Sequence, residues 1–244
     1  MLKRALITAG AGGIGAAIAL KAKADGYDVT ISDIDIETGE KLAAENGLTF
    51  IACDLGDEAQ VVEMIEKVGR VDLLVNNAGI SGPTTPIAEL ATSDWNKVFA
   101  INVTATFIVC REMVRLMKST GGSIVNISSV AAKIGYPNRA AYAASKRAVL
   151  GLTASLAREV GHDGIRVNAV LPGTVRGARI DDVIAKFAEA NDMSIEDAQA
   201  TYLKRHADGR FVEPEEIASL VVYLGSDAAR SITSEFISID GGFE

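Results

Sequence analysis

The chain has 244 residues, of which 48% are hydrophobic, and a formal net charge of -8. A single open α/β domain of this length can bury an ample core, and a sheet covered on both faces needs apolar strands in this amount. The negative charge argues against a nucleic-acid backbone or an anionic membrane surface as partner, so we expect neither.

Cysteine and histidine are too sparse for a disulfide framework or a metal site. Cys53 and Cys110 lie inside apolar segments, and His162 and His206 stand far apart with no other ligand type beside them. No metal is therefore expected. The chain starts Met-Leu-Lys-Arg and enters a strand without a long apolar segment, so we predict neither a signal peptide nor a transmembrane helix, and a cytoplasmic protein.

A glycine-rich turn follows the first predicted strand, residues 5–8. Residues 9–15 read Ala-Gly-Ala-Gly-Gly-Ile-Gly, and a helical pattern then continues to Ala24. Glycines in a strand-turn-helix context let the backbone approach a pyrophosphate, and the helix N-terminus adds unpaired N–H groups and partial positive charge. The sequence therefore predicts a dinucleotide site at this turn.

Acidic residues end the next two predicted strands, residues 28–32 and 48–53. Asp33 comes 18 residues after Gly15, where a carboxylate can accept hydrogen bonds from the adenosine ribose hydroxyls. Asp54 is placed to meet the adenine amino group. Either residue can instead cap a loop or the following helix, of which one is predicted from residue 57.

The remaining elements continue the alternation of strands and helices. A long helical stretch covers residues 93–118 and carries Asn102 in its apolar middle, where an amide needs a partner. Pro214 is predicted to open the last long helix at its first turn. Further strands are predicted at residues 71–75, 123–127, 165–171 and 236–239.

Tyr142 and Lys146 form the centre of the predicted chemistry. They lie four residues apart in an alanine-rich helical run that continues to Val160, so they share one helical face. A nearby ammonium lowers the pKa of a phenol from its usual value of about 10 and makes it a usable acid and base. Ser129 follows a strand 13 residues before Tyr142, where its hydroxyl can bond the substrate oxygen that Tyr142 protonates. The spacing of tyrosine and lysine alone is also typical of a half-buried ring beside a solvated charge.

With the glycine turn, Asn-Asn-Ala-Gly at residues 76–79, the serine and Tyr-x-x-x-Lys in order, the chain resembles the short-chain dehydrogenase/reductases over essentially its whole length. The resemblance implies an α/β Rossmann fold, a doubly wound seven-stranded parallel sheet, in a single domain of residues 1–244 that assembles as a homotetramer. It implies that Tyr142 is the acid/base, that Lys146 lowers the tyrosine pKa and binds the nicotinamide ribose, that Ser129 orients the carbonyl, and that Asn102 holds a water of the proton relay.

The resemblance also extends the expected cofactor site. Tyr142 and Lys146 belong to it as well as to the catalytic set. The other expected contacts are Gly10, Gly13, Ile14 and Gly15 at the pyrophosphate, Asp33, Asp54, Leu55, Asn76, Ala78 and Gly79 on the adenosine side, and Pro172, Gly173 and Val175 at the nicotinamide.

The sequence departs from the family pattern at two positions. Ala9 stands where the family usually has the first glycine of its turn, and one methyl group is tolerated there only if the backbone dihedral angles suit alanine. Gly177 stands where the family's Pro-Gly-x-x-x-Thr ends in the threonine that commonly touches the carboxamide. The nicotinamide contacts are therefore less well defined than the catalytic set.

We thus predict an NAD-dependent oxidoreductase that moves a hydride between nicotinamide C4 and a secondary alcohol or ketone of a small molecule, without metal. One alternative is an NADPH-dependent 3-oxoacyl-thioester reductase, which Asp33 argues against. The other is a non-catalytic cofactor-binding scaffold, which would not need Ser129, Tyr142 and Lys146 together. The sequence names neither the substrate nor the direction of the reaction.

An insertion at residues 174–213 is much longer than the usual connection between a strand and a helix, about 2 to 6 residues. Apolar residues at helical spacing from Ile180 to Phe187, and a helix start at Ser194, predict a two-helix lid over the active site. Cations lie near its bases, but interleaved acids favour a solvated face over a site for an anion on the substrate. The cations are Arg176, Arg179, Lys204, Arg205 and His206, and the acids are Asp181, Asp182, Glu196 and Asp197.

Overall fold

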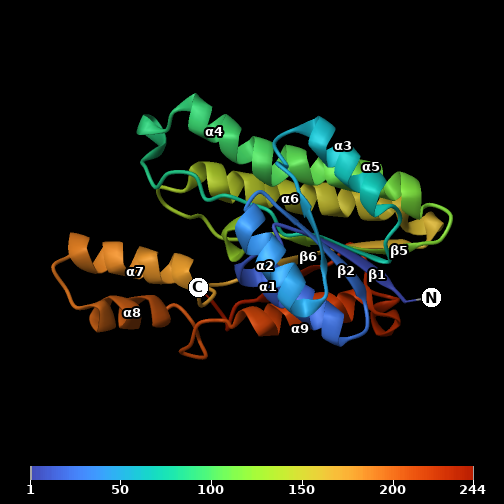
Figure 1. Cartoon of the computed structure of the whole chain (residues 1–244). Coiled ribbons are helices and arrows are strands. Elements are labelled where there is room, and N and C mark those ends of the chain that lie inside the picture. The colour runs from blue at the N-terminus through green and yellow to red at the C-terminus, as the bar shows by residue number, and fades with distance from the viewer. Residues whose placement is uncertain (1, 244) are drawn as a thin grey trace.

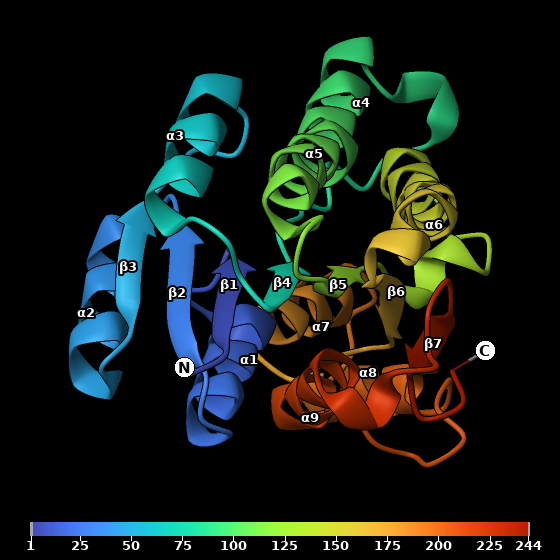
Figure 2. The same ribbon diagram turned by 90° about the vertical axis from the view of Figure 1, so that its right-hand side faces the viewer.

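A seven-stranded parallel sheet forms the centre of the computed structural model, which describes residues 2–243 except the side chains of residues 179, 186 and 190. The strand order is β3-β2-β1-β4-β5-β6-β7, and Figure 2 shows it from β3 at the left to β7 at the right. This order confirms the predicted doubly wound sheet. The strands are β1 Arg4–Thr8, β2 Asp28–Asp33, β3 Thr49–Ala52, β4 Leu73–Asn76, β5 Gly122–Ile127, β6 Ile165–Pro172 and β7 Phe236–Ile239.

Helices cover both faces of the sheet (Figure 1). Helices α1 and α9 pack on one face with Ile7 and Val75, and α3, α5 and α6 pack on the other with Leu6 and Leu74. Neighbouring residues of one strand therefore enter opposite cores, which is why each strand reads as a continuous apolar run. The helices are α1 Gly13–Ala24, α2 Ile36–Asn46, α3 Glu58–Val68, α4 Thr92–Phe99, α5 Ala105–Met117, α6 Ala140–Val160, α7 Ala178–Ala190, α8 Ile195–Leu203 and α9 Pro214–Gly225.

The long helical stretch predicted at residues 93–118 is interrupted by a π-helical turn, Ala100–Thr104, between α4 and α5. The N–H of Ala105 donates to the carbonyl of Ala100, five residues earlier, instead of four. The helix predicted to open at Pro214 is confirmed, with Pro214 at its first position and a capping box between Glu213 and Glu216.

The two helices predicted in the insertion are also confirmed. α7 and α8 pack on each other around a small core of their own, in which Ile184, Ala188 and Ala198 meet Phe211. Ser194 caps α8 by accepting a hydrogen bond from the N–H of Asp197. In Figure 1 the pair projects from one side of the molecule.

No helix among residues 2–243 combines the length and apolar character needed to cross a bilayer. In that same part of the chain, no group of three or more histidine, cysteine or acidic side chains is placed to hold a metal ion.

Candidate active site

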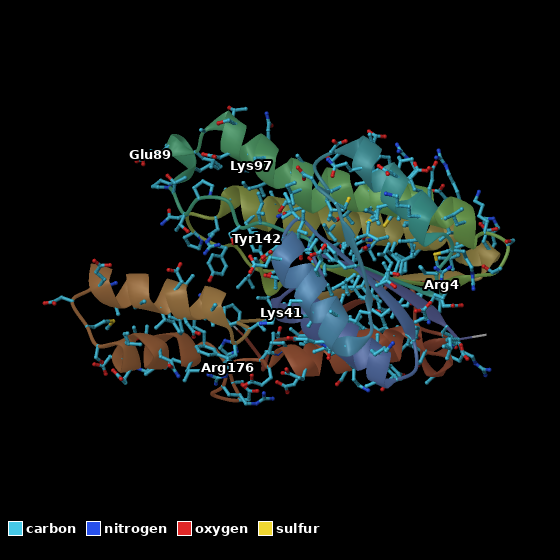
Figure 3. All side chains as sticks on the ribbon, in the orientation of Figure 1. Arg4, Lys41, Glu89, Lys97, Tyr142 and Arg176 are labelled. Atoms are coloured by element: carbon cyan, nitrogen blue, oxygen red, sulfur yellow. The ribbon has the colours of Figure 1, made fainter. Side chains whose placement is uncertain are left out.

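A cavity of about 580 Å³ opens at the carboxyl edge of the sheet. Its lining comes from segments that follow strands, including Ala9 after β1, Asn77 after β4, Ser129 after β5 and Thr174 after β6. The strand order reverses between β1 and β4, and in open α/β sheets ligands bind in the crevice at such a reversal. Figure 3 shows Tyr142 on the side from which α7 and α8 project, away from Arg4 at the start of β1.

The glycine turn forms one wall of the cavity. Gly12, Gly13 and Ile14 line it, and a Cβ atom added at Gly12 or Gly13 would meet nothing within 4 Å. Gly12 also begins α1 without a side-chain hydrogen bond to cap the helix. Open space in front of helix N–H groups fits a pyrophosphate.

The other two glycines of the turn serve packing. A Cβ atom at Gly10 would come within 2.8 Å of the Ile31 Cβ, and one at Gly15 would clash with the carbonyl of Ala9. Gly10 and Gly15 therefore hold the turn against β2 and α1, and neither lines the cavity.

Ala9, where the family pattern has glycine, adopts a left-handed backbone with φ of 48°. An L-residue with a Cβ atom loses about 1–2 kcal/mol in this region, which a glycine does not. The turn thus keeps its shape at a cost in stability.

Ala9→Gly is expected to raise the free energy of unfolding by up to about 1 kcal/mol, because part of the relief is offset by the greater freedom of glycine in the unfolded chain. Urea unfolding at matched protein concentration measures it. Ala16→Gly, inside α1, is the control and should lower stability by about 0.5–1 kcal/mol. Destabilisation by Ala9→Gly would show that the alanine is not strained.

Asp33 lies at the end of β2, beside the glycine turn. Its Oδ2 accepts from the N–H of Ala11 at 3.0 Å and its Oδ1 from the N–H of Asp35 at 3.1 Å. A carboxylate has about four acceptor positions, so this half-buried group keeps capacity for ribose hydroxyls. Asp54, after β3, is half-buried like its neighbour Leu55 and accepts from the N–H of Gly56 at 2.8 Å. Asp33, Asp54 and Leu55 lie outside the cavity lining.

The Asn-Asn-Ala-Gly segment divides between core and cavity. The Nδ2 of Asn76 is 2.9 Å from Asn126 Oδ1 in the core, and Asn76 is only 4% exposed. Its neighbour Asn77 lines the cavity instead and donates from Nδ2 to the carbonyl of Ala9 at 2.9 Å. Asn76 was the residue expected at the adenosine, yet the motif alone does not say which amide faces outward. Ala78 is half-buried and outside the lining.

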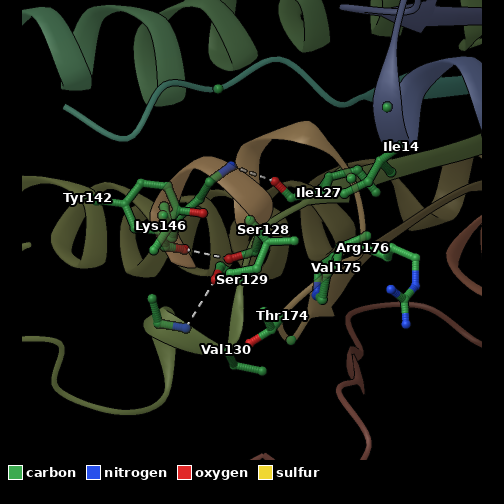
Figure 4. Close-up of a pocket in the computed structure, with 18 of the residues that line it drawn as sticks. Ile14, Ile127, Ser128, Ser129, Val130, Tyr142, Lys146, Thr174, Val175 and Arg176 are labelled. Atoms are coloured by element: carbon green, nitrogen blue, oxygen red, sulfur yellow. Dashed lines mark hydrogen bonds between the residues drawn. The ribbon is translucent and has the colours of Figure 1, made fainter. Parts of the chain in front are cut away.

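The three predicted reactive side chains converge on the cavity (Figure 4). Tyr142 and Lys146 come from the first turns of α6, and Lys146 is 4% exposed, with its Nζ 5.9 Å from the centroid of the Tyr142 ring. Lys146 donates to the carbonyl of Ile127 at 2.9 Å. Ser129 caps the short helical turn Val130–Ala132 by accepting from the N–H of Ala131 at 3.1 Å.

Asn102 lies behind this group, in the π-helical turn, and is 1% exposed. Its Oδ1 accepts from the N–H of Ile80 at 2.8 Å, and its Nδ2 donates to the Ile80 carbonyl and to the Ser145 Oγ, both at 2.9 Å. These are the partners that a buried amide needs. Asn102 thus joins the segment after β4 to α6. Gly79 of that segment lies close to Lys146, because a Cβ atom added at Gly79 would be 3.0 Å from Lys146 Nζ.

Pro172, Gly173 and Val175, the residues predicted to contact the nicotinamide, line the cavity at the end of β6. Thr174 lines it too, although the threonine of the family pattern is replaced by Gly177. Val175 forms a parallel bridge with Val212, so the two bases of the insertion are held together.

Several lining residues were missed by sequence reasoning. Tyr136 and Arg139 lie in the loop before α6, Tyr202 comes from α8 and Phe243 from the chain end. Arg139 and Tyr136 stand three and six residues before Tyr142, which was the available signal. Nothing in the local sequence of Tyr202 or Phe243 indicates that they reach the cavity.

Four matches to known proteins and families bear on this site. The family model described as "Enoyl-(Acyl carrier protein) reductase" matches residues 9–244. A 3beta-hydroxysteroid dehydrogenase of Mediterraneibacter gnavus is 37% identical, over 98% of this chain and 93% of that protein. A NAD+-bound xylitol dehydrogenase superposes with a TM-score of 0.90 at 30% identity, covering 98% of both chains. An actinorhodin polyketide ketoreductase variant with NADPH has a TM-score of 0.91 at 33% identity, covering 99% of this chain and 97% of that one.

Proposed function

Because this chain belongs to the short-chain dehydrogenase/reductase family, whose members oxidise alcohols and reduce ketones with a nicotinamide cofactor, we propose that it is an NAD-dependent dehydrogenase with Tyr142 as its acid/base. The observation that carries the proposal is the convergence of Ser129, Tyr142 and Lys146 on one cavity beside the glycine turn.

The bound cofactor supplies or accepts the hydride, and the residues of the chain provide position and proton transfer. In our proposal the Ser129 hydroxyl donates to the substrate oxygen and Tyr142 gives or takes its proton. Lys146 stabilises the phenolate by its charge and donates to the nicotinamide ribose. Asn102 supports this site from behind, through the backbone of Ile80 and the hydroxyl of Ser145.

Two observations support the choice of NAD and of a catalyst. Asp33 keeps a carboxylate beside the glycine turn, where a 2′-phosphate would meet it. The runner-up is an NADPH-dependent 3-oxoacyl-thioester reductase, which the likeness to an NADPH-bound ketoreductase favours and Asp33 opposes. A non-catalytic scaffold would not need Ser129, Tyr142 and Lys146 together.

A cytoplasmic location is part of the proposal, because Cys53 and Cys110 are buried free thiols that suit a reducing compartment.

A turnover screen tests the proposed reaction. NAD is offered with panels of hydroxy acids, polyols and cyclic alcohols, and formation of NADH is followed by absorbance. We expect NADH to form with at least one class, and faster than NADPH forms from NADP. Turnover that requires NADP with all classes would favour the thioester reductase, and no turnover in either direction would favour the scaffold.

We further propose that residues 174–213 act as a substrate lid that orders when cofactor and substrate bind. The pair α7 and α8 has its own core, so it can move as a unit. Its bases are joined by the Val175–Val212 bridge and flanked by Gly177 and Gly209, which have φ of 143° and 69°. Ile180, Val183 and Tyr202 of this unit line the cavity.

Hydrogen exchange is expected to slow in residues 176–208 when NADH and substrate are added together, because lid closure reduces local opening. Mass spectrometry of peptic fragments reads this out, with α3 as an internal reference whose exchange should stay unchanged. Identical exchange of residues 176–208 in both states would make the segment a static part of the fold.

We also propose a homotetramer. Family members pair the two long helices, those that carry Asn102 and Tyr142 here, and the last strand across two-fold axes. Phe107 on α5 is 44% exposed and is available for such a contact. The small residues Ala143, Ala144, Ala148 and Ala154 of α6 suit close helix packing, although they can also pack within one chain. Light scattering at micromolar concentration should give about four times the 25.6 kDa chain mass, and a monomer would refute the assembly.

A further inference from the structure

All the charged side chains in the described lining of the cavity are cationic. Arg139, Lys146 and Arg176 reach it, and no aspartate or glutamate does, although the chain has a net charge of -8. Two of these cations already have evident tasks. Lys146 belongs to the catalytic group, and Arg176 holds Glu213, with its Nε 2.8 Å from Oε1.

Arg139 has a different situation. It is the N-cap residue of α6, three residues before Tyr142, and both side chains line the cavity. Within residues 2–243, no carboxylate forms an ion pair with its guanidinium. Its backbone is fixed, because its N–H donates to the Tyr136 carbonyl at 3.2 Å and the adjacent Asn138 carbonyl accepts from Thr85 at 2.9 Å. A cation with a fixed base and no acid beside it therefore faces the cavity.

Three aromatic residues, Tyr136, Tyr202 and Phe243, line the cavity together with this arginine. Tyr202 lines the cavity, and burial raises its pKa while the charges of Arg139 and Arg205 partly oppose that rise. Its phenol therefore remains a hydrogen-bond donor near neutral pH. The Arg205 guanidinium lies 4.4 Å from the Phe243 ring centroid and 5.6 Å from that of Tyr136. A second cation therefore contacts the faces of aromatic rings that line the cavity.

The cofactor phosphates do not account for Arg139. The pyrophosphate is expected at Gly12 and Gly13, whereas Arg139 is bonded through its N–H to Tyr136, whose ring lies 5.6 Å from the Arg205 guanidinium just after α8. The acids that alternate with cations in the lid sequence do not neutralise it either. Their side chains are exposed and outside the cavity lining; they are Asp181, Asp182, Glu196 and Asp197.

We propose that Arg139, with Tyr136 and Tyr202, forms a carboxylate subsite, so that the substrate is a hydroxy acid or the corresponding keto acid rather than a neutral polyol. A guanidinium presents paired donors that match the two oxygens of a carboxylate, and the phenols add further donors. Because Arg139 and Tyr142 line the same cavity, the carboxylate and the reacting oxygen belong to one small substrate. This inference rests on the proposed dehydrogenase function and names the substrate class of the same site.

Matched acid and ester substrates test the subsite by kinetics. Wild-type protein should show a kcat/KM for a short hydroxy acid at least about tenfold above that of its methyl ester, as expected for a charge-assisted bond. Arg139→Gln should abolish this preference, and Arg139→Lys should restore part of it. Arg158→Gln is the control, because Arg158 is an exposed cation of the same helix outside the cavity, and it should leave the preference unchanged.

A binding measurement separates the subsite from the reaction. Benzoate and its neutral isostere benzamide are titrated into the NADH-loaded protein, with NADH fluorescence as readout. Benzoate should bind at least about tenfold more tightly than benzamide in wild type and the Arg158 variant, and equally with it in Arg139→Gln.

The outcomes are distinguishable. The subsite would be overturned if wild-type protein had the same kcat/KM for acid and ester, or if Arg139→Gln lowered both values equally. Turnover of neutral alcohols that depends on Tyr142 would in that case still support the dehydrogenase. Arg139-dependent benzoate binding with no turnover of any alcohol or ketone would support an anion site and overturn the proposed function.

Discussion

Tyr142→Phe is expected to lower kcat by about 10²-fold or more, because the variant has no hydroxyl to exchange a proton with the substrate oxygen. NADH binding should change little, since Lys146 and the glycine turn remain. The structure places the Tyr142 ring on the same helix as Lys146, with both residues on the cavity wall, so the loss concerns chemistry more than architecture.

Steady-state turnover and fluorescence titration of NADH measure the two effects separately. The matched control is Tyr223→Phe, because Tyr223 lies on α9, is 45% exposed and is outside the cavity lining. It should retain wild-type turnover. Ordinary turnover by the Tyr142 variant would mean that another group, or water, serves as the acid/base.

Asp33→Asn is expected to shift the preference from NADH toward NADPH. Two unit charges 4 Å apart repel by about 4 kcal/mol at an effective dielectric constant near 20, so the change in the ratio of the two dissociation constants has an upper limit of about a thousandfold. Asparagine keeps one acceptor for the N–H of Ala11, which limits any disturbance of the glycine turn.

Fluorescence titration with both cofactors measures the ratio. Asp35→Asn is the control, because Asp35 is an exposed cap of α2 two residues away and asparagine is an equally good cap. Its ratio should equal that of wild type. If wild-type protein binds NADPH as tightly as NADH, Asp33 does not select the cofactor.

The sequence predicted most of the architecture because local patterns determine it. Apolar runs mark the buried strands, the glycine turn follows β1, and Pro214 and Ser194 lie where helices begin. The π-helical turn at Asn102 was not predicted. Its bonds to Ile80 and Ser145 join segments far apart in the chain, and no helical periodicity contains that information.

The site was predicted only in part, for a similar reason. Ser129, Tyr142 and Lys146 lie in one short stretch, so their spacing is visible in the sequence. The position of Asn76 in the core and of Asn77 at the cavity depends on which side of β4 faces Asn126. Tyr202 and Phe243 reach the cavity only because the lid lies beside it and the chain end pairs with His206. Such contacts depend on tertiary packing and have no local signature.

The π-helical turn at residues 100–104 contains one residue more than a regular α-helical turn. Each residue of an α-helix advances the chain by about 100° around the axis. A π-helical turn, closed by a bond to the fifth residue back instead of the fourth, holds one extra residue within about one turn, so α4 and α5 keep the relative rotation of a continuous helix. Loss of one residue here would restore regular winding and leave the contact of α4 with α6, and the stacked rings of Trp95 and Phe99, in place. It would instead move Asn102 away from its bonds to Ile80 and Ser145, so relatives that differ here only in length would differ behind the catalytic group before they differ in outer surface.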